Sequence, residues 1–178
     1  MKKLILPAAV ILAALVPAAL VAATPVDTGV FQIELPDGFS KFTEQTQSSK
    51  QEQGVIETTN WVSKSPSGEA VVVTLSTMPG PILQPEKLIA STRDSLLKSL
   101  KATLESEEKR EDVFPSERLI FKSENAFFRS RFVVAGDRFY QLLHVGRSAD
   151  QRSAPAVQTM FNSFAINAPA PVEKTAGQ

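Results

Sequence analysis

The side chains best suited to chemistry lie in one predicted β-hairpin, centred on Gly136-Asp137. A Gly-Asp pair between two apolar runs is typical of a two-residue turn, because glycine tolerates the positive φ that such turns require. Counting outward from the turn pairs residue 129 with residue 144 and places four polar side chains on one face: Arg129, Arg131, Tyr140 and His144. Two guanidinium groups beside a phenol and an imidazole are suited to binding a carboxylate, phosphate or sulfate. The competing interpretation is a solvated face on which the arginine stems cover apolar rings.

The rest of the sequence excludes several kinds of chemistry. His144 is the only histidine and there is no cysteine, so two-histidine metal sites, thiolate nucleophiles and iron-sulfur clusters have no ligands or nucleophiles. No glycine-rich phosphate loop and no nucleophile elbow is present. Ser130 lies on the hairpin face opposite His144, which weakens a serine hydrolase. We therefore expect no metal, no cofactor and no catalytic residue.

The hairpin must be covered on its other, far more apolar face, which carries Phe128, Phe132, Val134, Phe139, Leu143 and Val145. The segment from Pro85 to about Glu105 predicts a covering helix, since five apolar residues fall in one arc at 100° per residue: Ile89, Leu96, Leu97, Leu100 and Leu104. Arg93 projects into that arc, either to anchor an anion or to extend its stem across the core edge. The charged run at 107–112 is interpreted as a solvated connection.

Other segments predict further strands. Phe31–Leu35 alternates strictly before a Pro-Asp-Gly turn, and the β-branched runs Val55–Val62 and Glu69–Met78 follow, with 43–53 as a loop or an edge strand. Arg118–Lys122 precedes the hairpin, and a short helix near Val157–Phe164 leads to a closing strand. The prediction is a single α+β domain, with an antiparallel sheet of about five to seven strands packed by one long and one short helix.

The ends of the chain predict an exported protein. Lys2 and Lys3 precede an apolar run, and small residues near position 23 are typical of a signal peptide cleaved after Ala23, the alternative being an uncleaved membrane anchor. This divides the chain into a signal peptide at 1–23, a linker at 24–29, a folded domain at 30–166 and a disordered tail at 167–178. The expected location is periplasmic or secreted, without stable membrane insertion after cleavage.

The composition argues against a nucleic-acid partner. The 178 residues carry 19 basic and 19 acidic groups, so no net field draws the chain to nucleic acid or to an anionic bilayer.

The sequence resembles the PsbP/DcrB-like superfamily. The resemblance rests on FQIELPDGF near the expected mature start, the long amphipathic helix, the hairpin FFRSRFVVAGDRFYQLLHVG and the closing MFNSFAI, and it covers about Val30 to Ile166. It implies an antiparallel sheet sandwiched by helices, and a non-enzymatic binding or assembly-assisting module. These motifs are structural, so the resemblance assigns no site residue.

The expected function is therefore that of an exported, non-catalytic binding or assembly-assisting module. Its partner would be an unidentified protein or a small anion, bound at the face that carries Arg129, Arg131, Tyr140 and His144. The alternative is a periplasmic hydrolase that depends on His144.

Overall fold

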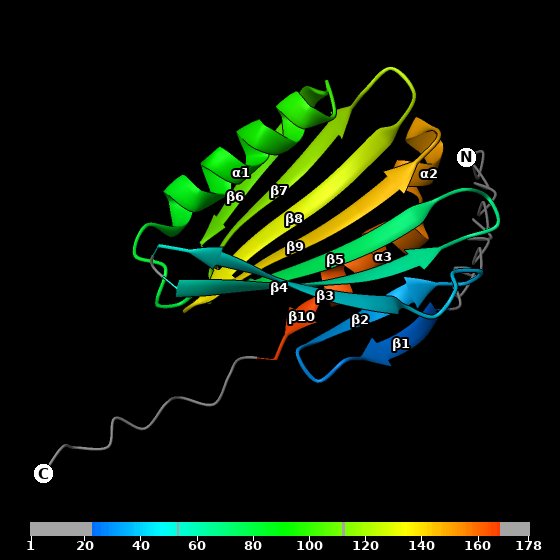
Figure 1. Cartoon of the computed structure of the whole chain (residues 1–178). Coiled ribbons are helices and arrows are strands. Elements are labelled where there is room, and N and C mark those ends of the chain that lie inside the picture. Colours follow the sequence, from blue (N-terminus) through cyan, green and yellow to red (C-terminus); the bar gives the residue numbers. More distant parts are fainter. Residues whose placement is uncertain (1–22, 53, 112, 168–178) are drawn as a thin grey trace, which may run out of the picture.

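The computed structural model describes residues 23–52, 54–111 and 113–167, so residues 1–22 of the expected signal peptide and the tail at 168–178 lie outside the described residues. Seven strands form one antiparallel sheet in the order β3-β4-β5-β9-β8-β7-β6, with bounds Thr43–Gln51, Gly54–Lys64, Ala70–Thr77, Arg138–Gly146, Phe127–Ala135, Pro115–Lys122 and Thr103–Glu111 (Figure 1). The prediction of an α+β domain with a mostly antiparallel sheet is confirmed. Thr43–Gln51, left open as a loop or a strand, is an edge strand.

A second sheet of three strands, β1-β2-β10, joins the two ends of the domain. Its central strand β2 (Phe31–Pro36) pairs with β1 (Ala23–Asp27) on one side and with β10 (Ala165–Ile166) on the other. Residues 24–29 were expected to be a linker, and that expectation is wrong for 24–27. The pattern ATPVD is short and holds a proline, which β1 tolerates because it is an edge strand.

Helix α1 (Pro85–Ser99) ends six residues earlier than expected. Leu100 is the C-cap, Lys101 turns into the left-handed region at φ 49°, and the N–H of Ala102 donates to the carbonyl of Leu97 at 2.8 Å. This is a Schellman ending, which in most helices places glycine where Lys101 stands. The chain then continues as strand β6, so the run at 107–112 is not a solvated connection but, up to Glu111, an edge strand paired with β7.

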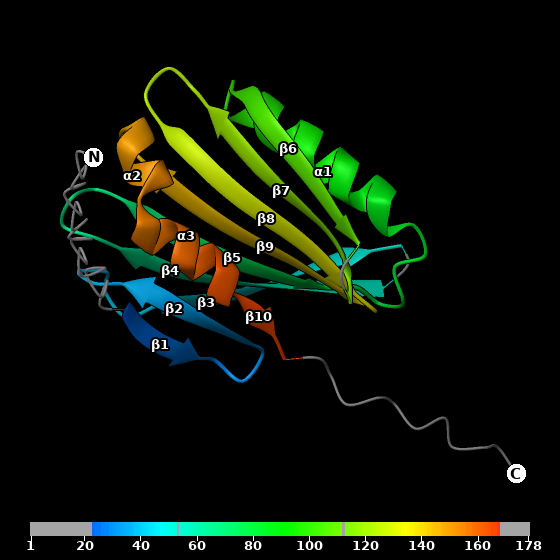
Figure 2. The same cartoon turned by 180° about the vertical axis from the view of Figure 1, so that it is seen from behind.

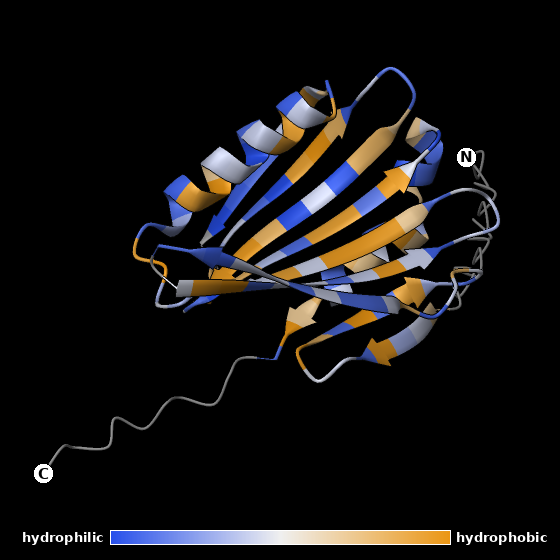
Figure 3. Cartoon of the chain, in the orientation of Figure 1, coloured by the Kyte–Doolittle hydropathy of each residue, from blue (hydrophilic) through white to orange (hydrophobic). Residues whose placement is uncertain are grey.

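Two apolar cores lie on opposite faces of the large sheet (Figures 1 and 2). On one face, Ile89 of α1 packs with the predicted apolar face of the hairpin, which includes Phe128 and Phe132. On the other face, β2 and α3 (Pro155–Ser163) pack their side chains on Val71 and Val73 of β5. Figure 3 shows this as apolar bands along β5 and the hairpin strands.

One helix was not predicted. Five residues, Ala149–Ser153, form α2, and the Ser148 side chain accepts a hydrogen bond from the N–H of Gln151 at its start. The structure therefore has a long helix and two shorter ones among the described residues, where one long and one short helix were expected. Asn167, assigned to the disordered tail, donates its N–H to the carbonyl of Val30 at 3.0 Å.

Candidate anion-binding face

The structure confirms the register of the hairpin. Arg129 pairs with His144, Arg131 with Leu142, Val133 with Tyr140 and Ala135 with Arg138. The four polar residues singled out from the sequence therefore do share one face of the sheet.

That face differs from the expected docking surface in one respect. Tyr140 and His144 are both 0% exposed. Tyr140 belongs to the core that β2 and α3 cover, and His144 lies on the same face beside Glu69. A partner cannot contact these two side chains in this structure. Arg129 and Arg131 remain partly exposed. In Figure 2, β6, β7 and β8 lie beside α3 rather than beneath it.

Arg131 is tied to the end of α3. Its Nη1 donates to the carbonyl oxygens of Phe161 and Phe164, at 3.4 Å and 3.1 Å, and its guanidinium lies 5.9 Å from the centre of the Phe164 ring. Backbone carbonyls at a helix C-terminus carry partial negative charge, so Arg131 helps to hold α3 on the sheet. These contacts give Arg131 a role in stabilising the fold.

Arg129 is held differently. Its guanidinium lies 5.2 Å from the centre of the Phe161 ring, and among the described residues it makes neither a hydrogen bond nor an ion pair. Partial burial, together with the nearby charges of Arg118 and Arg152, lowers the pKa of Arg129, although the carboxylate of Glu108 opposes this. An arginine stays protonated in proteins, so this lowered pKa means that a positive charge sits in surroundings that disfavour it.

Sequence reasoning missed a third arginine of this face. Arg118 on β7 lies directly opposite Arg131 on β8, and two like charges in such a cross-strand pair destabilise it. Its Nη1 donates to the side chain of Asn162 on α3 at 3.4 Å. The signal was available, because counting from a β7–β8 register would have placed residue 118 beside residue 131, but the loop at 123–126 gave no fixed turn type from which to count. We call Arg118, Arg129 and Arg131 the arginine cluster.

The acids around the arginine cluster are already paired. Glu108 bonds Arg110 at 2.9 Å, and Glu105 bonds Lys122 at 3.0 Å and Arg152 at 2.5 Å. These hydrogen bonds lower the pKa of both carboxyl groups, so both are ionised at neutral pH, and Glu108 also interacts electrostatically with Arg118 and Arg129. The cluster therefore keeps an excess of positive charge, suited to a carboxylate, phosphate or sulfate brought by another molecule.

His144 has no catalytic geometry. Its Nε2 lies 3.2 Å from Oε1 of Glu69, whose Oε2 accepts a hydrogen bond from the Ser67 hydroxyl at 2.6 Å. Its Nδ1 is buried, without a hydrogen-bond partner among the described residues. A histidine base needs one nitrogen on the orienting acid and the other on a nucleophile or substrate that can reach it. Here the second nitrogen is buried, where no substrate can reach it.

A cavity of about 360 Å³ beneath α1 holds a second set of charges that the sequence did not indicate. Glu117 of β7 is 3% exposed and its carboxylate lies 3.4 Å from Arg93, which also bonds Asp94 at 2.9 Å and Glu107 at 3.0 Å. Burial raises the pKa of Glu117. Arg93 therefore neither anchors a free anion nor only covers the core edge, but joins three carboxylates of its own chain.

Two absences hold for the described residues. No three of their histidine, aspartate and glutamate side chains gather closely enough to hold a metal ion. None of their helices has the length and apolarity needed to cross a membrane.

Comparison with known proteins gives a fold and no family assignment by sequence. No family model matches the chain, and no curated protein matches it. Among solved structures, the chain is similar to the solution structure of cyanobacterial PsbP (CyanoP) from Synechocystis sp. PCC 6803, with a TM-score of 0.56 and 12% identity over 85% of this chain and 96% of that one. The chain therefore has a PsbP-like fold, as the resemblance implied.

Proposed function

We propose that this chain, a PsbP-like α+β domain, is an exported, non-catalytic binding module whose arginine cluster receives an anionic group of its partner. The partner is a protein that presents a carboxylate, or a small anion. The observation that supports the proposal is Arg129, a partly buried guanidinium without a hydrogen bond or an ion pair among the described residues. The acid that interacts with it electrostatically, Glu108, is itself bonded to Arg110. Buried charges are in general paired, so a guanidinium that shares its nearby carboxylate with other arginines marks a place where a further counter-ion could bind.

The neighbouring charges support an anion rather than a cation. Arg118 and Arg131 face each other across two strands, and Glu105 and Glu108 are held by other bases. An anion between Arg118 and Arg129 would relieve the repulsion between them and form charge-assisted hydrogen bonds with both. Tyr140 and His144 are left out of this site because both are buried.

The fold fits a module that works through binding. The similar solved structure is titled as cyanobacterial PsbP, but 12% identity extends only the fold to this chain. The choice of binding over catalysis therefore rests on the site. The carboxylates beside the arginine cluster, Glu105 and Glu108, are bonded to basic side chains, and His144 is buried in the core.

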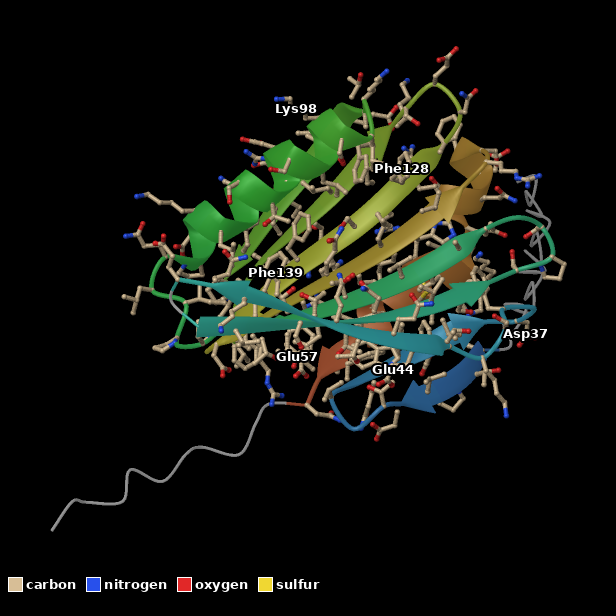
Figure 4. All side chains as sticks on the ribbon, in the orientation of Figure 1. Asp37, Glu44, Glu57, Lys98, Phe128 and Phe139 are labelled. Carbon is tan, nitrogen blue, oxygen red and sulfur yellow. The ribbon has the colours of Figure 1, made fainter. Side chains whose placement is uncertain are left out.

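The test is titration with inorganic sulfate, pyrophosphate and succinate, followed by NMR chemical shifts of the arginine side chains. We expect saturable shifts that include Arg129, and we expect Arg129→Gln and Arg118→Gln each to weaken binding by about tenfold, the loss of roughly one charge-assisted contact. Lys98→Gln is the matched control, because Lys98 lies on α1, on the other face of the sheet (Figure 4). Equal affinity in all three variants, or no saturable shift at all, would contradict an anion site.

Capture experiments address a protein partner. The parent chain and the Arg118→Gln/Arg129→Gln variant are immobilised and exposed to a periplasmic extract of the native host. If the variant folds and retains every protein that the parent retains, the arginine cluster is not the docking site.

A further inference from the structure

The two edges of the large sheet differ in how well they are protected against pairing with another strand. At one edge, β6 reads TLESEEKRE, so charged residues fill most of its length, and its register with β7 shifts between Leu104 and Ser106. Charges and bulges are the devices by which proteins keep an edge strand from pairing with another chain. Edge β6 is therefore protected.

Edge β3 has few charges and no bulge. It reads TEQTQSSKQ, it contains no proline, and its nine residues pair with β4 in an unbroken register from Thr43–Val62 to Gln51–Gly54. Every residue of β3 is exposed, and no described strand pairs with its outer side. Figure 4 shows Glu44 on this strand, at the front of the sheet. A long, regular, weakly protected edge is a template for strand addition.

The strand is complementary to itself. When two copies of β3 are placed antiparallel about a two-fold axis through Gln47, all nine residues of each copy find a partner in the other. The only two charges of the strand then meet, because Glu44 lies opposite Lys50 of the second copy and Lys50 lies opposite Glu44. Opposite charges in directly facing cross-strand pairs stabilise a sheet. The register that gives the longest overlap is thus also the one that pairs the charges.

The side chains between the charged pairs fit as well. In this register Thr46 faces Ser48 of the second copy, Gln45 faces Ser49 and Gln47 faces itself. Pairs of hydroxyl and amide side chains on neighbouring strands form hydrogen bonds without burying an unpaired charge. Since each pair joins two even-numbered or two odd-numbered residues, the backbone groups that point outward from one copy meet those that point outward from the other.

Glu44 is already held in place by its facing neighbour on β4, Trp61. Its Oε2 accepts a hydrogen bond from the indole N–H of Trp61 at 2.8 Å, and Trp61 is 6% exposed. The indole thus restricts the Glu44 side chain on the inner side of β3, so Lys50 of the second copy, whose stem is long, must reach over β3 to meet the carboxylate. A fixed side chain loses little conformational entropy when it forms an ion pair.

We propose that β3 is a dimerisation edge, which pairs antiparallel with β3 of a second copy of this chain to form one continuous sheet across a two-fold axis. This proposal is independent of the anion site, because the arginine cluster lies on β7 and β8, toward the opposite edge. A dimer would leave both clusters accessible and would bind a bivalent anionic partner with higher avidity.

Sedimentation velocity of the purified protein, as the native host processes it, tests the proposal. We expect a concentration-dependent monomer–dimer equilibrium that weakens at high salt. Glu44→Lys and Lys50→Glu each create like-charge pairs, and each should raise the dissociation constant about tenfold or more. An equimolar mixture of the two single variants should recover association, because the two lysines on β3 of one variant then face the two glutamates on β3 of the other. The double variant should self-associate like the parent.

Controls separate the interface from folding. Lys109→Glu reverses a charge on β6 and should leave the dissociation constant unchanged. Glu44→Lys also removes the bond to Trp61, so Lys50→Glu, which leaves that bond intact, decides the test if the first variant unfolds. A protein that stays monomeric at millimolar concentration, a dimer insensitive to Lys50→Glu, or a mixture of folded variants that fails to associate would each overturn the proposal.

Discussion

Two buried titratable residues respond to burial in opposite directions. His144 is 0% exposed, and burial lowers its pKa although the bond to Glu69 opposes this. Glu117 is 3% exposed, and burial raises its pKa although Arg93 opposes this. In both cases the environment favours the neutral form, as low polarity requires. The two residues therefore give stability a pH dependence of opposite sign.

His144 makes the protein less stable in mild acid. In the unfolded chain a histidine takes up a proton at about pH 6.5, while the folded state resists protonation of His144. The stability that this residue contributes is complete above that pH and is lost as pH falls toward the folded pKa. We expect the free energy of unfolding, measured with urea from about pH 7.5 to about pH 5, to fall with decreasing pH. His144→Gln should flatten this dependence, and an unchanged slope would contradict the assignment.

Glu117 acts in the other sense. Its folded pKa is raised, so the stability that it contributes is present at and below the unfolded pKa and is lost as pH rises through the folded value. At neutral pH the residue is therefore unfavourable as a carboxylate. Glu117→Gln should change the unfolding free energy by less than about 1 kcal/mol, because Arg93 keeps Asp94 and Glu107. A loss of about 3 kcal/mol or more in urea unfolding would show that the buried pair stabilises the fold.

For single residues, the sequence predicted which hairpin residues face each other, but it did not predict which side chains are buried. The turn at Gly136-Asp137 fixed which residues of the hairpin face each other, and those pairs are correct. Whether Tyr140 and His144 are covered depends on elements such as α3 and β2, which lie elsewhere along the chain and whose position no local pattern encodes. Arg118 and Glu117 were missed for the same reason, since both acquire their surroundings only when other elements pack on β7.

Helix α1 departs from the usual sequence pattern at its C-terminal end, where a glycine is normally found. Lys101 occupies the left-handed position of a Schellman ending, with φ 49°, where glycine avoids a steric clash of Cβ. A residue with a Cβ in that region costs about 1 kcal/mol or more relative to glycine. The missing glycine also explains why the apolar period, which continues to Leu104, predicted a longer helix.

Lys101→Gly should therefore stabilise the protein by about 1 kcal/mol, less the larger loss of backbone freedom that glycine suffers on folding. The measurement is the midpoint of thermal or urea unfolding. Lys98→Gly is the matched control, because it places glycine inside the last turn of α1 and should destabilise by a similar amount. Destabilisation by both variants would contradict the ending described here.

Helices and strands with a clear hydrophobic period were predictable from the sequence, and those without one were not. Strand β2 buries Phe31, Ile33 and Leu35 and exposes Gln32 and Glu34, as strict alternation predicts. Strand β6 has the composition of a solvated loop and is a strand because β7 provides its hydrogen-bonding partner. Helix α2 has five residues, too few for a period to appear.

The export prediction concerns the whole chain. We propose that residues 1–23 are a signal peptide that is removed. Cleavage after Ala23 would leave a chain that begins at Thr24, and β1 would keep its pairs from Thr24–Leu35 to Asp27–Gln32. Intact-mass measurement on protein from the native host should give this start, without lipid. Recovery of the full chain in the membrane fraction would favour the uncleaved anchor.

The small sheet also imposes an order of events on folding. Strand β2 takes one neighbour from the beginning of the domain and one from its end, and the N–H of Glu34 donates to the hydroxyl of Ser163, 129 residues away. Contacts between such distant residues form late, because the intervening chain must first lose its freedom. A polypeptide emerges from a ribosome or a translocation channel with its N-terminus first. It therefore cannot complete the small sheet around β2 until Ile166 has emerged. Until then Phe31 and Ile33 lack the cover that α3 gives them in the folded domain, so we expect the nascent chain to expose both side chains.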